Sequence, residues 1–100
     1  MEYALPSSRR LHWSDRKNRE LMERHGIGFS DVVSAIENGG FLDMRRHPDT
    51  RPYGHQLQLL VEIDGYVFVV PCVVHDDGLF LKTLYPSRKA TAAYLGRGSN

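Results

Sequence analysis

The segment 79–94 holds the residues whose types are best suited to chemistry. It reads as an apolar strand with one lysine, then a sharp turn, then a terminal helix that opens with Arg88 and Lys89. From Leu79 onward there are four basic residues and no acidic one: Lys82, Arg88, Lys89 and Arg97. Cations on an apolar scaffold offset phosphate charge and donate hydrogen bonds to phosphate oxygens. The segment therefore indicates a phosphate-binding site; the alternative is a buried strand followed by an ordinary solvated helix.

Composition limits the class of protein. The length of 100 residues predicts one domain, 1–100, with loose ends at 1–8 and 96–100. A net charge of +1 does not by itself require a nucleic-acid partner, so any basic surface must be local. The one cysteine, Cys72, excludes a disulfide framework and favours a cytoplasmic protein. The longest apolar run, 66–74, is far short of the ~20 residues of a membrane span, and no apolar leader is visible.

Local patterns predict an α+β fold with a small antiparallel β-sheet meander, two N-terminal helices and a C-terminal helix. Ser14 and Ser30 are the expected N-caps of the first two helices, and Gly26 follows the first. The pair Asp64-Gly65 is a strong hairpin signal. The expected elements are a strand at 10–13, helices at 14–25 and 30–39, an edge strand at 41–46, a loop at 47–56, strands at 57–63, 66–74 and 79–85, and a last helix from 87.

Simple closure of both hairpins sets the register of the meander. Ile63 then pairs with Tyr66, and Val74 pairs with Leu79. Pro71 lies in the middle strand and implies a bulge or a lost ladder bond. Alternation predicts a core face made of Leu57, Leu59, Val61, Ile63, Tyr66, Phe68, Val70, Cys72, Val74, Leu79, Leu81 and Tyr85.

The opposite face of the meander is apolar, including Leu84, except for three polar side chains. These are Gln58, Glu62 and Lys82. The same hairpin register brings Arg88 toward one end of that face. Lys82 and Arg88 would hold a scissile phosphate and stabilise the charge that develops on its oxygens. Glu62 would remove the proton of a ribose 2′-hydroxyl, which then attacks the adjacent phosphorus. The alternative is that Glu62 and Lys82 form only a surface ion pair.

Nothing in the sequence indicates a metal or another cofactor. The five histidines lack the i, i+4 spacing of a helical metal site. The exposed first helix carries Lys17 among other cations and could touch a phosphate backbone or an acidic partner. The candidates for RNA contact are therefore Gln58, Lys89 and Lys17, beside the catalytic candidates Glu62, Lys82 and Arg88.

Two blocks of the chain resemble the BrnT-like toxin family. The opening block has Trp13, Lys17, Asn18, the run His25-Gly26-Ile27, and Phe29. The closing block is the run 84–91, Leu-Tyr-Pro-Ser-Arg-Lys-Ala-Thr, followed by Tyr94, and it is similar to the last strand and helix start of that family. Arg88 matches the arginine of the closing motif in that family. Pro86 stands where the family usually has another residue, and the segment 39–56 does not match the family pattern.

This resemblance implies a RelE-like fold and a ribonuclease toxin of a toxin–antitoxin system. It implies RNA as substrate, messenger RNA above all, and neutralisation by a cognate antitoxin in a hetero-oligomer; a homo-oligomer stays open. We therefore expect a metal-independent endoribonuclease. The alternative is a non-catalytic binding or regulatory protein that keeps the same fold, and a sequence-specific DNA reader is a weaker third reading because no helix concentrates base-reading side chains.

Overall fold

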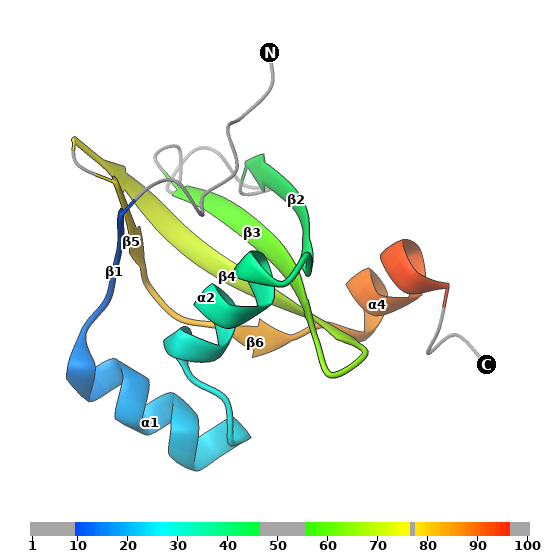
Figure 1. Ribbon diagram of the computed structural model, residues 1–100, viewed down its shortest axis with the longest axis horizontal. Coiled ribbons are helices and arrows are strands. Elements are labelled where there is room, and N and C mark those ends of the chain that lie inside the picture. The colour runs from blue at the N-terminus through cyan, green and yellow to red at the C-terminus, as the bar shows by residue number, and fades with distance from the viewer. Residues whose placement is uncertain (1–9, 47–55, 77, 97–100) are drawn as a thin grey trace.

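Nine helices and strands make up the described part of the chain. The computed structural model of the protein describes residues 10–46, 56–76 and 78–96 (Figure 1). The predicted loop at 47–56, except for its last residue, and most of the two predicted loose ends lie outside these ranges. In chain order the elements are β1 (Arg10–His12), α1 (Asp15–His25), α2 (Phe29–Glu37), β2 (Phe41–Arg46), β3 (Gln56–Ile63), β4 (Tyr66–His75), β5 (Gly78–Leu81), β6 (Tyr85–Pro86) and α4 (Arg88–Leu95).

These elements form an α+β fold around a mixed sheet. The strand order is β1-β5-β4-β3-β2, and β6 pairs with β4. The predicted antiparallel meander is confirmed as β3, β4 and β5, and so are the two N-terminal helices and the C-terminal helix. The strand predicted at 10–13 is β1, and it adds a parallel edge to this meander by pairing with β5. No hairpin joins these two strands, so no turn dictates their direction.

Both predicted hairpin registers are confirmed. Ile63 pairs with Tyr66, and Val74 pairs with Leu79. The turn residue Asp64 has a φ of 55°, which is the left-handed conformation that a two-residue turn of this kind demands. Local turn chemistry therefore fixes which side chains of β3 and β4 share a face.

The chain after β5 is shifted by one residue along β4. The Lys82 N–H donates to the Pro71 carbonyl at 2.8 Å. Proline has no N–H, so Pro71 cannot return a bond to Lys82, and the regular ladder ends there. When pairing resumes in β6, Tyr85 lies opposite Val69, where an uninterrupted register would place Leu84.

This shift exchanges the faces of two side chains. Leu84 is 1% exposed and belongs to the core, whereas Tyr85 is 42% exposed. The predictions that Tyr85 faces the core and that Leu84 lies on the opposite face are therefore wrong, because one extra residue reverses the alternation. Val74 was also predicted in the core and is exposed, because the β4–β5 hairpin extends past the helices (Figure 1).

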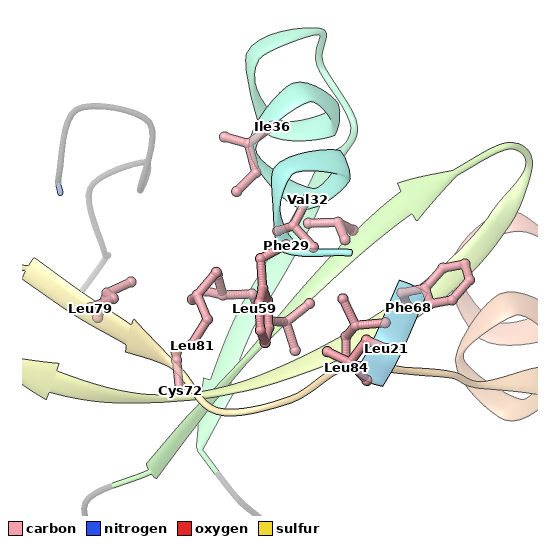
Figure 2. Close-up of a cluster of buried hydrophobic side chains, with 12 residues drawn as sticks. Leu21, Phe29, Val32, Ile36, Leu59, Phe68, Cys72, Leu79, Leu81 and Leu84 are labelled. Atoms are coloured by element: carbon pink, nitrogen blue, oxygen red, sulfur yellow. The ribbon is translucent and has the colours of Figure 1, made fainter. Parts of the chain in front are cut away.

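The main core lies between one face of the sheet and the helices α1 and α2. Figure 2 shows side chains from α2 directed onto strand residues such as Leu59 and Leu81. Most of the predicted core face is confirmed by this cluster. Its buried members are Leu21, Phe29, Val32, Ile36, Leu59, Val61, Phe68, Val70, Cys72, Leu79, Leu81 and Leu84.

Residues of the opening motif build the corner between α1 and α2. Trp13 stacks on the fully buried Phe29 with ring centroids 5.6 Å apart. The Asn18 Oδ1 accepts a hydrogen bond from the Phe29 N–H at 2.7 Å. Gly26 has a left-handed φ of 71° and ends α1, as predicted. A Cβ on Gly28 would meet the Asn18 side chain at 2.5 Å, so a larger residue would disturb this corner.

The helix caps agree with the sequence at α1 and differ at α2. Ser14 is the N-cap of α1, and its side chain accepts a first-turn N–H at 3.2 Å. The prediction that Ser30 caps α2 is wrong, because the N-cap is Gly28. The Asp31 carboxylate reaches back and accepts the Gly28 N–H at 2.8 Å, which supplies the cap from inside the helix.

Candidate functional site

Two hydroxyl groups of the closing motif, with main-chain hydrogen bonds, cap α4 and anchor it to β4. Ser87 is the N-cap, and its Oγ accepts the Ala90 N–H at 3.0 Å. The Ser87 N–H donates to the Val67 carbonyl at 2.9 Å. In return, the Val67 N–H donates to Thr91 Oγ1 at 2.9 Å, and Thr91 Oγ1 donates to the Ser87 carbonyl at 2.7 Å. The threonine hydroxyl thus replaces a direct ladder bond and fixes where α4 begins.

The same helix packs on the sheet face opposite α1 and α2. Leu60 and Val67 are fully buried under α4, where they contact Ala90. Leu42 joins this cluster because β2 has an irregularity between Phe41 and Asp43, which leaves it as an extra residue opposite β3. Figure 1 shows α4 at the β3–β4 hairpin end of the molecule, apart from α1 and α2. The helix α4 therefore covers the part of this face that contains Leu60 and Val67.

A pocket of about 260 Å³ lies between α4 and β2. One wall is the flank of α4, and the other is the edge strand β2. Two cations and two hydroxyl groups reach it, above a floor of alanine. Its lining residues are Arg45, Ser87, Lys89, Ala90, Ala93 and Tyr94.

Arg45 is held in place at this pocket by Gln58. The two residues are register partners on β2 and β3, and the Arg45 Nε donates to Gln58 Oε1 at 2.9 Å. Gln58 is 4% exposed, so its amide has little freedom to leave the arginine. The guanidinium also hydrogen-bonds the Tyr94 side chain, so two neighbours hold it beside the pocket. This is a preorganised cation at the mouth of a pocket.

Tyr94 forms the third corner of the pocket with Asp43. Its hydroxyl donates to Asp43 Oδ2 at 2.7 Å, and Asp43 Oδ1 accepts the Met44 N–H at 2.8 Å. This hydrogen bond, with smaller contributions from burial and from the Asp43 charge, raises the pKa of Tyr94, while nearby Arg45 lowers it. The phenol is therefore protonated at neutral pH, with its proton directed at the carboxylate.

Two predicted site residues lie at the pocket, and a third lies in the strand row that contains one of them. Lys89 lines the pocket and is exposed, and Gln58 lies beneath Arg45. Lys82 is exposed and lies in the cross-strand row of Pro71 and Gln58, as the register predicts. The cations at the pocket are therefore Arg45 of β2 and Lys89 of α4, and Lys82 does not line it.

The remaining three predicted residues lie elsewhere. Glu62 is half-buried and lies four residues along β3 from Gln58, which corresponds to about 13 Å. Leu60, covered by α4, lies between them on the same face. Arg88 is exposed at the start of α4 but does not line the pocket, because successive helix residues point about 100° apart. Lys17 is on α1, against the opposite face of the sheet. The six residues thus form no single cluster.

Sequence reasoning did not select Arg45, Asp43 or Tyr94 as chemical groups. A signal for the first two was present, since they alternate along the predicted edge strand 41–46 and would share a face with a partner strand. Their pairing partner was not predictable, because the long predicted loop 47–56 leaves the register of this strand open. Tyr94 belongs to the closing motif but carried no assigned role.

Other features of the described residues limit the chemistry. No group of three or more His, Cys, Asp or Glu in this part of the chain is placed to hold a metal ion. Cys72 is buried, and burial raises the pKa of its thiol to about 12, so it is not a nucleophile at neutral pH. None of the helices at 15–25, 29–37 and 88–95 has the length and apolar character needed to cross a bilayer.

Comparison of the chain with protein-family models, with curated proteins and with solved structures gives no match. The functional conclusion therefore depends on the residues and the geometry described above.

Proposed function

We propose that the protein is a metal-independent endoribonuclease that binds an RNA phosphate in the pocket between β2 and α4. The observation that carries the proposal is the arrangement of Arg45 and Lys89 on facing walls of a pocket of about 260 Å³. A volume of this size admits a phosphate with its attached sugar, and two cations can offset the charge of that phosphate. The exposed Lys82 and Arg88 would contact neighbouring phosphates of the same strand.

The chemistry follows from what such a pocket can stabilise. A ribose 2′-hydroxyl attacks the adjacent phosphorus, the bond to the 5′-oxygen of the next nucleotide breaks, and a 2′,3′-cyclic phosphate forms. Negative charge builds on the non-bridging oxygens during this step. Arg45 and Lys89 would stabilise that charge, and the fixed position of Arg45 on Gln58 lowers the cost of reorganisation.

The resemblance to BrnT-like toxins supports the same function and adds a partner. The motif residues Trp13 and Asn18 have defined roles in the α1–α2 corner, and Ser87 and Thr91 have defined roles in anchoring α4. Chains that share these motifs would share these local structures, which is why we propose a RelE-like fold. A cytoplasmic toxin neutralised by a cognate antitoxin in a hetero-oligomer is part of this proposal.

A second candidate is a non-catalytic protein that binds RNA or a regulatory partner with the same face. It is favoured by one observation: Glu62, the predicted general base, is separated from Gln58 by the covered Leu60. If no other base serves the pocket, anion binding would occur without cleavage. The two candidates differ in whether the RNA is broken.

Induced expression in a bacterial host tests the first candidate. We expect the native chain to arrest growth, and Arg45→Ala at the same soluble level to permit it. Arg46→Ala is the matched control, because this exposed arginine is the next residue of β2 and does not line the pocket. Normal growth with the native chain at confirmed expression would favour the non-catalytic candidate, and growth arrest by Arg45→Ala would exclude Arg45 from the mechanism.

A further inference from the structure

Tyr85 is exposed although it lies in a strand of the sheet. It pairs with Val69, and Val69 pairs in turn with Leu60, which α4 covers. Side chains opposite each other in a ladder share a face of the sheet, so the Tyr85 ring lies on the α4 face. The residue is nevertheless 42% exposed. The one-residue shift after Pro71 has this effect, because an uninterrupted register would place the apolar Leu84 here.

The exposed ring stands at one end of the pocket between β2 and α4. The pocket follows the length of the helix, because Ser87 at its start and Tyr94 in its last turn both line it. Tyr85 precedes Ser87 by two extended residues, which separates their Cα atoms by about 7 Å. Arg45 lies at the other end, beside Tyr94. An RNA strand whose phosphate is bound at Arg45 and Lys89 can therefore bring an adjoining nucleotide to the ring.

A cation accompanies the ring on the sheet. Lys82 is exposed and lies in the row of Pro71, and Tyr85 lies in the next row of the same face, that of Val69. Alternate residues of a strand are about 7 Å apart, so an ammonium group and an aromatic ring adjoin here. In the described part of the chain no ring pair includes Tyr85. Proteins that bind single strands combine such rings, which stack on bases, with cations that hold the backbone.

We propose that Tyr85 is a base-stacking subsite, on which the nucleobase next to the pocket-bound phosphate lies, with Lys82 on the following phosphate. The inference rests on the RNA binding of the proposed function and deepens it, because it names what is recognised beside the phosphate. The base must be unpaired, since the faces of a paired base are covered by its neighbours in the duplex. Every base has a stacking face, so the subsite selects single-stranded nucleotides and not a sequence.

A thermodynamic cycle between the protein and the RNA tests this subsite. The probe is a short single-stranded RNA with 2′-O-methyl groups, which cannot be cleaved, prepared also with one base removed at each position in turn. Fluorescence anisotropy measures the affinity. Tyr85→Ala should bind the complete RNA about fivefold or more weakly, the usual loss for one stacked base. At one position the missing base should cost the native chain a similar factor and cost Tyr85→Ala nothing, because the ring and the base act as a pair.

Further variants show whether the aromatic face carries the effect. Tyr85→Phe keeps the ring and should bind within about twofold of the native chain, whereas Tyr85→Leu should bind as weakly as Tyr85→Ala. Val74→Ala is the matched control, because this exposed side chain near the end of β4 does not line the pocket. Its affinity for the complete RNA should equal that of the native chain.

The outcomes separate this subsite from the proposed cleavage. Equal losses at every position without a base, additive effects of Tyr85→Ala and base removal, or a phenylalanine variant as weak as alanine would each overturn the inference. If Arg45→Ala abolishes binding while Tyr85→Ala binds as the native chain does, the pocket stands and the subsite falls. If the cycle shows the expected coupling but unmodified RNA is not cleaved, the proposed cleavage fails and the subsite stands. Absence of any RNA binding would overturn both.

Discussion

Replacing Thr91 with valine should destabilise the fold although the two side chains have nearly the same shape. Thr91 is 1% exposed, and its hydroxyl serves two main-chain groups at once. It accepts the Val67 N–H at 2.9 Å and donates to the Ser87 carbonyl at 2.7 Å. In Thr91→Val the Val67 N–H loses its partner in a buried position. The Ser87 carbonyl keeps one, because it also accepts the Thr91 N–H at 2.9 Å.

The size of the effect can be worked out from these contacts. A buried main-chain donor without a partner costs about 1–3 kcal/mol. The methyl group that replaces the hydroxyl returns up to about 0.8 kcal/mol of apolar burial. The loss of the second hydrogen bond adds about 0.5–1.5 kcal/mol. The net expectation is about 2 kcal/mol, which lowers the Tm of a domain of this size by roughly 8–16 °C.

Urea unfolding and thermal unfolding followed by circular dichroism measure this change. Thr91→Ser is the matched control, because it keeps the hydroxyl and loses only one buried methyl group, at about 1 kcal/mol. We expect Thr91→Ser to be clearly more stable than Thr91→Val. A valine variant as stable as the native protein, or a serine variant less stable than the valine variant, would refute the role given to the hydroxyl.

Three further predictions follow from the structure. Leu84→Ala should cost about 2–5 kcal/mol whereas Tyr85→Ala should cost under about 1, and equal costs in urea unfolding would contradict the one-residue shift. The thiol of Cys72 should resist alkylation at pH 8 in the native protein and react only after unfolding, and rapid native labelling followed by mass spectrometry would contradict its burial. The folded state holds the Tyr94 proton more tightly than the unfolded chain, so the stability from this bond is complete below pH 10 and lost as pH rises through the folded pKa. In Asp43→Ala the Tyr94 absorbance titration should shift to lower pH, and an unchanged titration would count against the hydrogen bond.

The central hairpins were predictable because local chemistry determines them. Asp64 and Gly65 favour a two-residue turn, and the alternation on either side leaves one register that buries the apolar set. The three helices likewise follow from capping residues and apolar spacing. One N-cap was predicted wrongly: α2 begins after Gly28 instead of Ser30, and the Asp31 side chain inside the helix supplies the capping hydrogen bond.

The errors in the fold arose where non-local geometry decides. Pro71 was recognised as a residue that interrupts the ladder, but the sequence does not say where the neighbouring chain absorbs the interruption. It does so beyond Lys82, which carries Leu84 into the core and Tyr85 out of it. The parallel pairing of β1 depends on the path of two helices, which no local pattern specifies.

The candidate site was predictable only in part for the same reason. The alternation of side chains along the strands correctly placed Gln58 and Lys82 in one cross-strand row. Lys89, which lines the pocket, was selected from the closing motif. The position of α4 across Leu60 was not visible from the sequence, so Glu62 was grouped with residues from which the helix separates it. Arg45 depends on the register of an edge strand that follows no tight turn.

The most direct test is cleavage of RNA by the purified chain in the presence of EDTA. Because the account assigns phosphate binding to the pocket between β2 and α4, the native chain should give products with 2′,3′-cyclic phosphate ends. Arg45→Ala should reduce the rate by about 100-fold or more, and Arg46→Ala should not. Absence of cleavage by the native chain, or equal rates for the two arginine variants, would contradict the account.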